Sequence, residues 1–314
     1  MRIQKALLVA KPWRGGLADY IFRALKVEFG SDVHWLPTYP ISNSEKANYR
    51  KDRNLWRKNL VSDLCKMQYD FALFINYLPE FESLGHSHKH ALWLTDDPRP
   101  IASKVSSFSN IFLSDPGYLD EFEKLLPHEA QVSILPFGCD PEIHKQIQPD
   151  PHGGLCFLGN RDPKRTQHLK CLLTNGKRVS IYGNYFLSTS LFWKSPWSFR
   201  PKVEFSKMSQ VYCNYTASLN IHAQVVRGGT NMRTFECAAV GIPQLVEFRP
   251  GLGDYFSPEE DLLVYHDEQD LCASYDQIMG DAELRRKMVA SSRKIALDRH
   301  TYRHRVRTIV NSLK

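Results

Sequence analysis

The residues best suited to chemistry lie in an arginine- and glycine-rich stretch, residues 227–236, which has the sequence RGGTNMRTFE. A glycine loop that opens into a helix presents backbone N–H groups, and these groups and the helix dipole favour an anion, typically a phosphate. Glu236 lies about one and a half turns inside the predicted helix, within reach of hydroxyl groups on the same ligand. The stretch predicts half of a nucleotide-sugar site, although such junctions are as often simple tight turns. The donor-binding residues predicted from it are Gly228, Gly229, Thr230, Asn231, Arg233 and Glu236.

A second cationic segment follows a predicted strand at residues 155–158. Three cations within five residues at the mouth of a strand–helix turn can neutralise a pyrophosphate, and arginine supplies paired donors. A solvated turn is the alternative, but the pairing with the glycine loop favours donor binding. The residues of this segment assigned to donor binding are Gly159, Asn160, Arg161, Lys164 and Arg165.

Two further strand ends contribute weaker candidates. Tyr182 and Gly183 end a predicted strand and are assigned to the approach of a nucleobase. His222 ends the strand before the glycine loop, where it either touches the sugar or is a satisfied core histidine.

Carboxylates at predicted strand ends in the first half are candidates for a general base. Asp96 and Asp97 are adjacent, and adjacent carboxylates raise each other's pKa; alternatively, one of them caps a turn before Pro98. Asp19 is either a base or a helix cap. Arg233 is the best candidate for stabilising a departing diphosphate, on which negative charge develops in the transition state. The two aspartates are contiguous and form no DxD triplet, so no metal site is predicted.

These residues are positioned by alternating strand-like and helix-like segments, which predict parallel sheets covered by helices. The expected strands include residues 5–10, 33–36, 70–76, 91–95, 110–113, 155–158, 179–182, 219–222 and 244–247. The expected helices include 18–29, 48–67, 163–173, 230–240 and 268–279. A polar, proline-rich segment at 145–153 predicts a linker between a first domain, 1–147, and a second domain, 148–314. Two doubly wound domains leave a cleft at the carboxyl ends of their strands.

Composition fits a globular α/β protein: of 314 residues, 42% are hydrophobic and 24% charged. The net charge of +7 suits a phosphorylated ligand, an anionic membrane surface or nucleic acid, but no polybasic block favours nucleic acid. The first apolar run is too short for a signal peptide or a membrane span. Seven scattered cysteines without CxxC spacing predict reduced thiols in the cytoplasm and no structural zinc.

The second half resembles the CgeB-like (spore maturation protein CgeB type) glycosyltransferases of the GT-B superfamily. The matching segments are residues 135–141, 157–160, 181–183, 219–222, 229–236, 255–256 and 300–305, with Trp93 and 96–98 in the first half. The resemblance implies a GT-B fold of two Rossmann-like domains, with the donor on the second and residues 300–314 packed back on the first. It implies that Glu236 binds the ribose, that Arg161, Lys164 and Arg165 hold the diphosphate, and that no metal takes part. The Glu-x7-Glu pattern of retaining enzymes is incomplete, because Gly228 stands at the position of the first acid.

The favoured hypothesis is therefore a cytoplasmic glycosyltransferase that moves a sugar from a nucleotide diphosphate donor, such as a UDP-sugar, to an acceptor hydroxyl. A glycan, a lipid-linked molecule or a protein is the expected acceptor. No cofactor is expected, since the nucleotide sugar is a co-substrate, and the positive charge suggests peripheral contact with anionic surfaces. The alternatives are a phage-type transferase acting on a modified base in DNA, a non-catalytic nucleotide-sugar binding protein, and a GT-B-type epimerase or phosphorylase.

Overall fold

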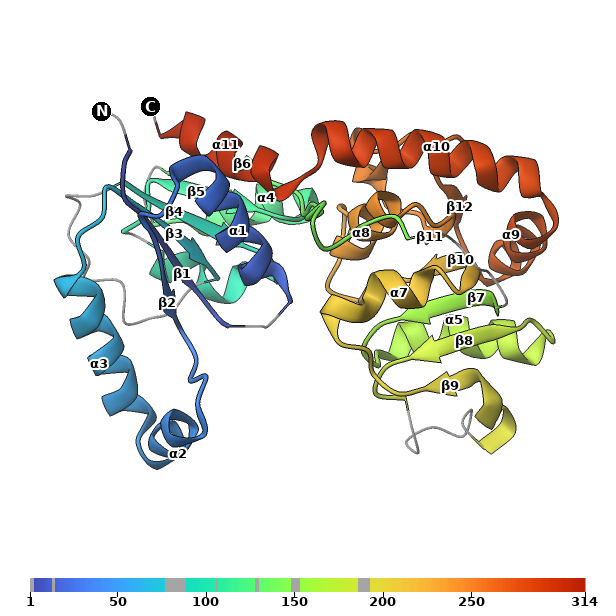
Figure 1. The fold of residues 1–314 in the computed structure, drawn as a ribbon, viewed down its shortest axis with the longest axis horizontal. Coiled ribbons are helices and arrows are strands. Elements are labelled where there is room, and N and C mark those ends of the chain that lie inside the picture. The colour runs from blue at the N-terminus through green and yellow to red at the C-terminus, as the bar shows by residue number, and fades with distance from the viewer. Residues whose placement is uncertain are drawn as a thin grey trace. The chain divides into compact units, whose positions relative to one another are not determined.

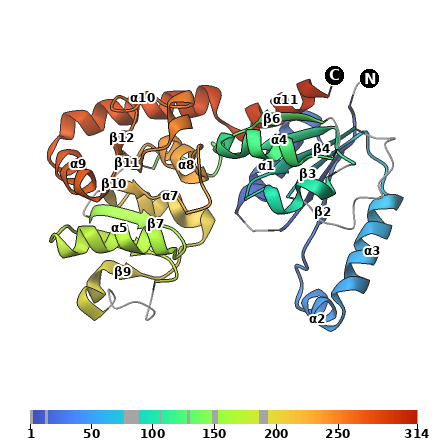
Figure 2. The same ribbon diagram turned by 180° about the vertical axis from the view of Figure 1, so that it is seen from behind.

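The computed structural model describes residues 3–12, 15–76, 89–105, 107–127, 130–147, 153–185 and 193–313. The chain divides into two compact units: unit 1 contains Met1–Pro136 and Tyr302–Lys314, and unit 2 contains Phe137–Thr301. Each unit has a parallel six-stranded sheet with helices packed around it (Figures 1 and 2). Within the described residues, no helix combines the length and the apolar sequence needed to cross a bilayer.

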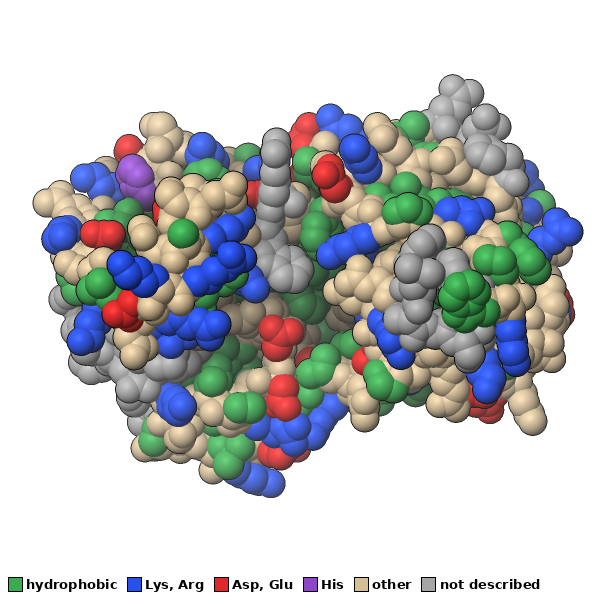
Figure 3. Space-filling view, turned by 90° about the horizontal axis from the view of Figure 1, so that it is seen from below, with side chains coloured by type: hydrophobic (Ala, Val, Ile, Leu, Met, Phe, Trp, Pro, Cys, Tyr) green, Lys and Arg blue, Asp and Glu red, His purple; other side chains and the backbone are tan. Residues whose placement is uncertain are grey.

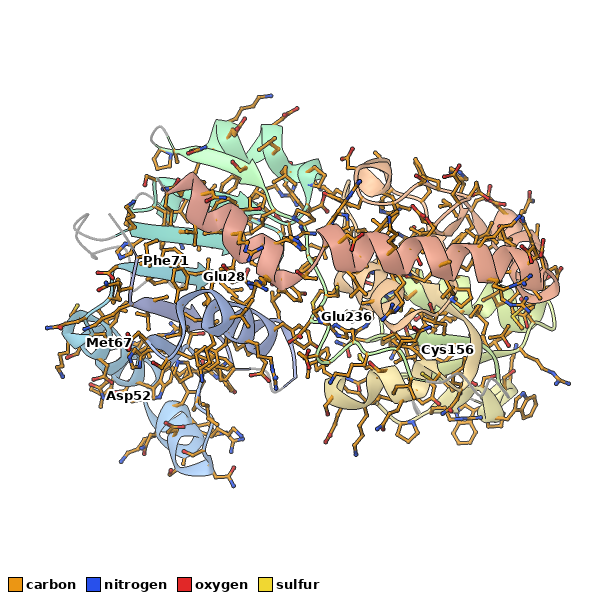
Figure 4. The ribbon with its side chains drawn as sticks, turned by 45° about the horizontal axis from the view of Figure 1, so that its top comes forward. Glu28, Asp52, Met67, Phe71, Cys156 and Glu236 are labelled. Atoms are coloured by element: carbon orange, nitrogen blue, oxygen red, sulfur yellow. The ribbon has the colours of Figure 1, made fainter. Side chains whose placement is uncertain are left out.

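The sheet of unit 1 has the strand order β2-β1-β3-β4-β5-β6. Its strands are β1 (Ala6–Ala10), β2 (Val33–Pro37), β3 (Phe71–Ile75), β4 (Lys89–Leu94), β5 (Asn110–Leu113) and β6 (Gln131–Ile134). Its helices are α1 (Leu17–Phe29), α2 (Asn43–Lys51), α3 (Arg53–Lys66), α4 (Leu119–Leu125) and α11 (Tyr302–Ser312), with 3₁₀ turns at Arg99–Lys104 and Pro116–Tyr118. Every residue of β1 and β3 is buried, as expected for parallel strands covered on both faces. Figure 4 labels Phe71 at the start of β3.

The prediction of one long helix at 48–67 is wrong, because the structure has two helices there. Asp52 stands between α2 and α3 in an extended conformation, and its Oδ1 accepts hydrogen bonds from the backbone N–H groups of Asn54 and Leu55. An aspartate that caps a new helix in this way ends the preceding one.

The last helix, α11, belongs to unit 1 although it follows unit 2 in the chain. The Tyr302 ring stacks on Tyr20 of α1 at 5.5 Å between ring centroids. Arg303 and Arg307 both donate to Glu28, the penultimate residue of α1, which is labelled in Figure 4. Aromatic packing and paired charges thus hold the end of the chain on the first helix.

The sheet of unit 2 has the order β12-β11-β10-β7-β8-β9. Its strands are β7 (Gly153–Leu158), β8 (Val179–Tyr182), β9 (Phe199–Arg200), β10 (Tyr215–Asn220), β11 (Gln244–Glu247) and β12 (Leu263–Tyr265). Its helices are α5 (Pro163–Thr174), α7 (Met208–Tyr212), α8 (Met232–Val240), α9 (Glu268–Gly280) and α10 (Ala282–Arg299), with 3₁₀ turns at Pro196–Ser198, Phe205–Lys207 and Pro250–Asp254. Helix α8 ends, as its sequence predicts, at a left-handed glycine, Gly241, with a φ of 83°.

Candidate functional site

The polar residues of unit 2 gather where three neighbouring strands end. Strands β11, β10 and β7 are adjacent and parallel, so the segments that follow them meet at one edge of the sheet. The segments that begin near residues 159 and 221 lead into α5 and α8, and the segment that begins at 248 leads into the 3₁₀ turn Pro250–Asp254 (Figure 1). The structure thus brings the basic turn and the glycine loop to one sheet edge.

Glu247, the last residue of β11, contacts residues from the segments that follow all three strands. Its Oε1 pairs with Lys164 Nζ and with Arg249 Nη2, the latter at 3.0 Å. Its Oε2 accepts a hydrogen bond from the backbone N–H of His222 at 2.9 Å. One buried carboxylate therefore orients two cations, Lys164 in the first turn of α5 and Arg249 in the segment after β11.

The environment of Glu247 keeps its carboxylate ionised. Burial on its own raises the pKa, but the hydrogen bonds from His222 and Lys164 and the charge of Arg249 outweigh it and lower the pKa to about 2. Together, Lys164, Arg249 and Glu247 carry one net positive charge. The edge therefore remains attractive to an anion.

Arg165 donates hydrogen bonds to backbone carbonyl groups of the segment after β10 and the turn after β7. Its Nε donates to Ile221 O at 3.0 Å and its Nη1 to Asn160 O at 3.2 Å. Burial lowers its pKa, and the charge of Arg233 acts in the same direction. Arg161, two residues before α5, is exposed to solvent.

Side chains cap the first turns of α5 and α8, whereas the sequence predicted backbone N–H groups open to a ligand there. Asp162 caps α5 by accepting from the N–H groups of Lys164 and Arg165, at 3.0 and 3.3 Å. Asn231 caps α8 by accepting from the N–H of Arg233 at 2.9 Å. These side chains already occupy first-turn amides of the two helices.

A buried polar network lies under the glycine loop. His222 Nε2 is 2.9 Å from Thr230 Oγ1, and Thr230 in turn contacts Thr234. Asn220 Nδ2 donates to Thr234 Oγ1 at 2.8 Å, and Asn231 Nδ2 donates to Asn220 Oδ1 at 2.7 Å. The His222 side chain has no solvent exposure, as in a core histidine, but only one ring nitrogen is satisfied. Among the described residues its Nδ1 has no hydrogen-bond partner and lies 3.7 Å from Glu247 Oε2.

Backbone contacts also hold the glycine loop in place. Gly228 O accepts from Gly251 N at 2.7 Å, and Arg249 Nε donates to Val226 O at 3.2 Å. Both partners belong to the segment after β11. The loop is therefore tied to the strand end that carries Glu247.

Arg233 and Glu236 form an ion pair one turn apart on α8. The Glu236 carboxylate, labelled in Figure 4, has an exposed fraction of only 1%, whereas 20% of the Arg233 side chain is exposed. The Arg233 guanidinium also lies over the Phe205 ring, 5.4 Å from its centroid. Glu236 thus faces inward in this structure, and Arg233 is the member of the pair that reaches solvent.

His144 contacts the same ion pair from the other side. Its Nε2 lies 3.6 Å from Glu236 Oε1, and its Nδ1 accepts from the backbone N–H of Asp140 at 3.0 Å. Since Nδ1 is an acceptor, the proton of the neutral ring is on Nε2, facing the carboxylate. His144 therefore lies against Glu236 without a hydrogen bond between Nε2 and Oε1.

Tyr182 and Gly183 serve the packing of the sheet edge. The Tyr182 hydroxyl is 2.9 Å from the Tyr215 hydroxyl. Gly183 has a φ of 154°, and a Cβ added there would lie 2.0 Å from Gly159 O. The two strand ends approach so closely that only glycine fits at position 183.

Asp96 and Asp97, the adjacent carboxylates of unit 1, make different contacts. Arg99 binds Asp97 through Nε at 2.9 Å and Nη2 at 2.6 Å, and its backbone N–H donates to the same carboxylate at 3.1 Å. Asp97 is therefore the residue that caps the turn around Pro98. Asp96 is solvent-accessible and accepts a weak contact from Asn76 Nδ2 at 3.4 Å.

Asp96 has the environment of a base, although not for the predicted reason. Surrounding protein atoms raise its pKa by desolvation, and the charge of Lys11 partly opposes them; Asp97 takes no part. Asp19 lies in the first turn of α1 and accepts a hydrogen bond from the N–H of Gly15, which precedes the helix; the N-cap residue is Gly16, so Asp19 is not the helix cap. It also lines a cavity of about 410 Å³ at the ends of β1 and β2, with Lys11, Trp35, Tyr39, Ile41 and Lys46 among its other residues.

Three buried histidines of unit 2 make stability depend on pH. Burial lowers the pKa values of His144, His168 and His222 below the ordinary 6.5. Below that pH the unfolded chain binds more protons than the native chain. We therefore expect Tm to fall as the pH is lowered from about 8 to about 5. A Tm series should show a shallower fall for His168→Gln than for a control, His34→Gln, at an exposed site. Identical slopes for the two variants would contradict this account.

Sequence analysis missed Glu247, Arg249 and His144. Glu247 and Arg249 stand at the carboxyl end of a correctly predicted strand, β11, and that position is the signal by which they could have been found. His144 lies in the segment before the predicted linker and offers no local signal. It contacts α8 only through the fold of unit 2.

Comparison with known proteins agrees with this architecture. Residues 164–311 match the family model described as "Glycosyl transferase-like". The match begins at Lys164 of the basic turn and includes Glu247 and the glycine loop. It confirms the predicted enzyme class, a glycosyltransferase. A search of curated proteins by sequence found no match.

Solved structures match nearly the whole chain. Sucrose-phosphate synthase from Thermosynechococcus elongatus has a TM-score of 0.69 at 11% identity, with 98% of this chain and 99% of that chain covered. HepE of Anabaena in complex with UDP also gives 0.69, at 10% identity and with the same coverage. The lipopolysaccharide outer core galactosyltransferase WaaB gives 0.66 at 14% identity, over 98% and 99% of the two chains. The chain has the GT-B fold, as its sequence predicted.

Proposed function

We propose that this glycosyltransferase moves a sugar from a nucleotide diphosphate donor to an acceptor hydroxyl, with the donor bound on unit 2. The observation that carries the proposal is the set of cations around Glu247, where β11, β10 and β7 end. Lys164 and Arg249 are held by one carboxylate, and Arg165 binds the backbone of the segments that follow β10 and β7. A diphosphate is the anion whose charge and size match several cations at a strand edge.

The diphosphate is held mainly by side chains. Lys164 keeps 25% of its side chain exposed, so it can exchange part of its contact with Glu247 for a phosphate oxygen without leaving α5. Arg165 uses two N–H groups for backbone carbonyls and has others left for a ligand. Glu247 keeps the cations in place before the ligand arrives, which reduces the entropy lost on binding.

Arg233 stabilises the leaving group in this proposal. The acceptor oxygen forms a bond to the anomeric carbon while the bond from that carbon to the diphosphate breaks, and the electron pair goes to the phosphate oxygen. A guanidinium that moves onto this oxygen stabilises the charge that develops there. Its departure from Glu236 frees the carboxylate for the ribose hydroxyls, the contact that the family resemblance implies.

If the reaction inverts the anomeric centre, Asp96 is the better candidate for the base that takes the acceptor proton. Its pKa is raised while the carboxylate remains accessible. The cavity beside Asp19 and Lys11 supplies an acceptor subsite with aromatic walls, Trp35 and Tyr39. We also propose the CgeB-like type and a UDP-sugar donor, which Anabaena HepE, a structure solved with UDP and with UDP-glucose, supports by analogy.

Substitution of Lys164 by methionine tests the donor site. Loss of a charge-assisted contact is worth about 1.5–3 kcal/mol, so we expect UDP to bind roughly 10- to 100-fold more weakly in isothermal titration. Lys170→Met, at an exposed position on the same helix, is the matched control and should bind UDP normally. Equal affinities for the two variants would exclude this edge as the diphosphate site. Hydrolysis or transfer from UDP-sugars, followed by product analysis, then separates an enzyme from a binding protein.

A further inference from the structure

A concentration of positive charge lies outside the donor site, on α2 and α3 of unit 1. Residues 43–58 contain six lysines and arginines against two acids, which gives +4 of the total net charge of +7. The six cations are Lys46, Arg50, Lys51, Arg53, Arg57 and Lys58. Helix α2 has no buried residue, and both views place it beyond the sheet of unit 1 (Figures 1 and 2).

The two acidic side chains of this segment accept hydrogen bonds from backbone N–H groups. Glu45 accepts from the N–H groups of Ile41 and Ser42, at 2.9 and 2.8 Å, in the capping box of α2. Asp52 caps α3. Both carboxylates therefore secure helix ends instead of alternating with the cations along the outer surface.

A row of aromatic rings fixes the two helices relative to the rest of unit 1. Tyr39 contacts Tyr49 of α2 at 5.2 Å, and Tyr49 contacts Trp56 of α3 at 5.4 Å between ring centroids. Trp56 packs against the buried core of the unit. The Arg53 guanidinium lies over the Tyr49 ring, 5.4 Å from its centroid. Lys46 and Arg57 are half-buried, and Arg50, Lys51 and Lys58 are exposed.

Large apolar side chains are exposed among these cations. Ile41, just before α2, is 60% exposed, and Leu55, in the first turn of α3, is 55% exposed. Figure 3, viewed from below Figure 1, shows Lys and Arg side chains gathered on this part of unit 1 with hydrophobic side chains between them. We define residues 39–58 as the α2–α3 surface.

We propose that the α2–α3 surface docks on an anionic lipid bilayer. Clustered Lys and Arg side chains are attracted to negatively charged headgroups, and each contributes roughly a fivefold gain in binding near the surface. Exposed Leu55 can enter the boundary between headgroups and acyl chains. A nucleic acid would use the cations but gives no role to this apolar side chain. Docking here goes beyond the proposed transfer reaction and does not depend on it.

Co-sedimentation with vesicles tests the proposal on the full-length protein. Binding to phosphatidylcholine mixed with phosphatidylglycerol should be strong and should weaken with salt, and binding to phosphatidylcholine alone should be weak. The variant Arg50→Glu/Lys51→Glu/Lys58→Glu should bind the anionic vesicles roughly 100-fold more weakly. The matched control is Lys170→Glu/Lys287→Glu/Lys294→Glu, with the same change in charge at exposed sites of unit 2. Equal binding by the two triple variants would overturn the proposal.

A second variant separates a bilayer from other polyanions. Leu55→Ser keeps every charge and changes an exposed side chain, so folding should be unaffected, which a melting curve can verify. We expect its binding to anionic vesicles to be about tenfold weaker, because an inserted leucine is lost. Unchanged vesicle binding would show that no apolar side chain inserts. Binding to an RNA oligonucleotide that needs the same three cations, without vesicle binding, would assign the surface to nucleic acid. Either result contradicts docking on lipid.

Discussion

Glu247→Gln is expected to lower Tm by roughly 4–12 °C, which corresponds to about 2–3 kcal/mol for a unit of this size. Glutamine cannot carry the negative charge that Lys164 and Arg249 share, so two half-buried cations would lie near each other without compensation. The estimate is below the usual range for a fully buried pair because Lys164 and Arg249 keep 25% and 17% of their side chains exposed. Thermal unfolding of Glu247→Gln beside Glu260→Gln, at an exposed site, measures the effect.

The same variant should change the response to acid. The pKa of Glu247 is about 2 in the native protein and 4.5 ordinarily, so its stabilisation is present above pH 4.5 and is lost as the pH falls towards 2. By linkage this contribution is about 3 kcal/mol. Glu247→Gln lacks it at every pH, and its melting temperature should approach that of the wild type in strong acid. A constant difference between the two proteins from pH 4.5 down to pH 2 would disagree with the low pKa.

Arg233→Gln is expected to reduce kcat roughly 100- to 1,000-fold, with a smaller change in the affinity for UDP. The guanidinium is proposed to act on the leaving diphosphate, where charge develops only during reaction, so its loss affects the transition state more than the bound donor. Arg233→Lys should recover part of the activity, because it restores a positive charge beside Glu236 but not paired donors.

Steady-state kinetics and melting curves should be measured on the same preparations. Glutamine retains a hydrogen-bond donor for the buried Glu236 carboxylate, which limits the structural damage of the substitution. Full activity of Arg233→Gln would rule out the proposed role. A loss of activity that follows Tm, without recovery in Arg233→Lys, would mean that Arg233 acts only on the structure.

Local sequence patterns predicted most elements of the fold. The bounds of β8 and β11 match the expectation, and Gly241 ends α8 as predicted, because apolar runs and a glycine stop are local signals. The break between α2 and α3 was missed because Asp52 lies inside an otherwise helical pattern. Only the observed cap distinguishes it from an exposed helical aspartate.

The candidate site was predictable in part, for a physical reason. The basic turn and the glycine loop were recognised from residue types, but their meeting point depends on the strand order, which places β11 next to β10 and β10 next to β7. Glu247 acquires its importance from that order. The inward orientation of Glu236 depends on a rotamer, and the carboxylate lies against His144, more than ninety residues earlier in the chain; no local pattern contains this information.

The return of α11 to the first unit determines which fragments of this protein can be made. A fragment that ends before Tyr302 would leave the ring of Tyr20 without its stacking partner and Glu28 without two arginines. The amino-terminal half expressed by itself should therefore be prone to aggregation. Residues 137–301 form one continuous piece, so recombinant production of a single unit should begin there.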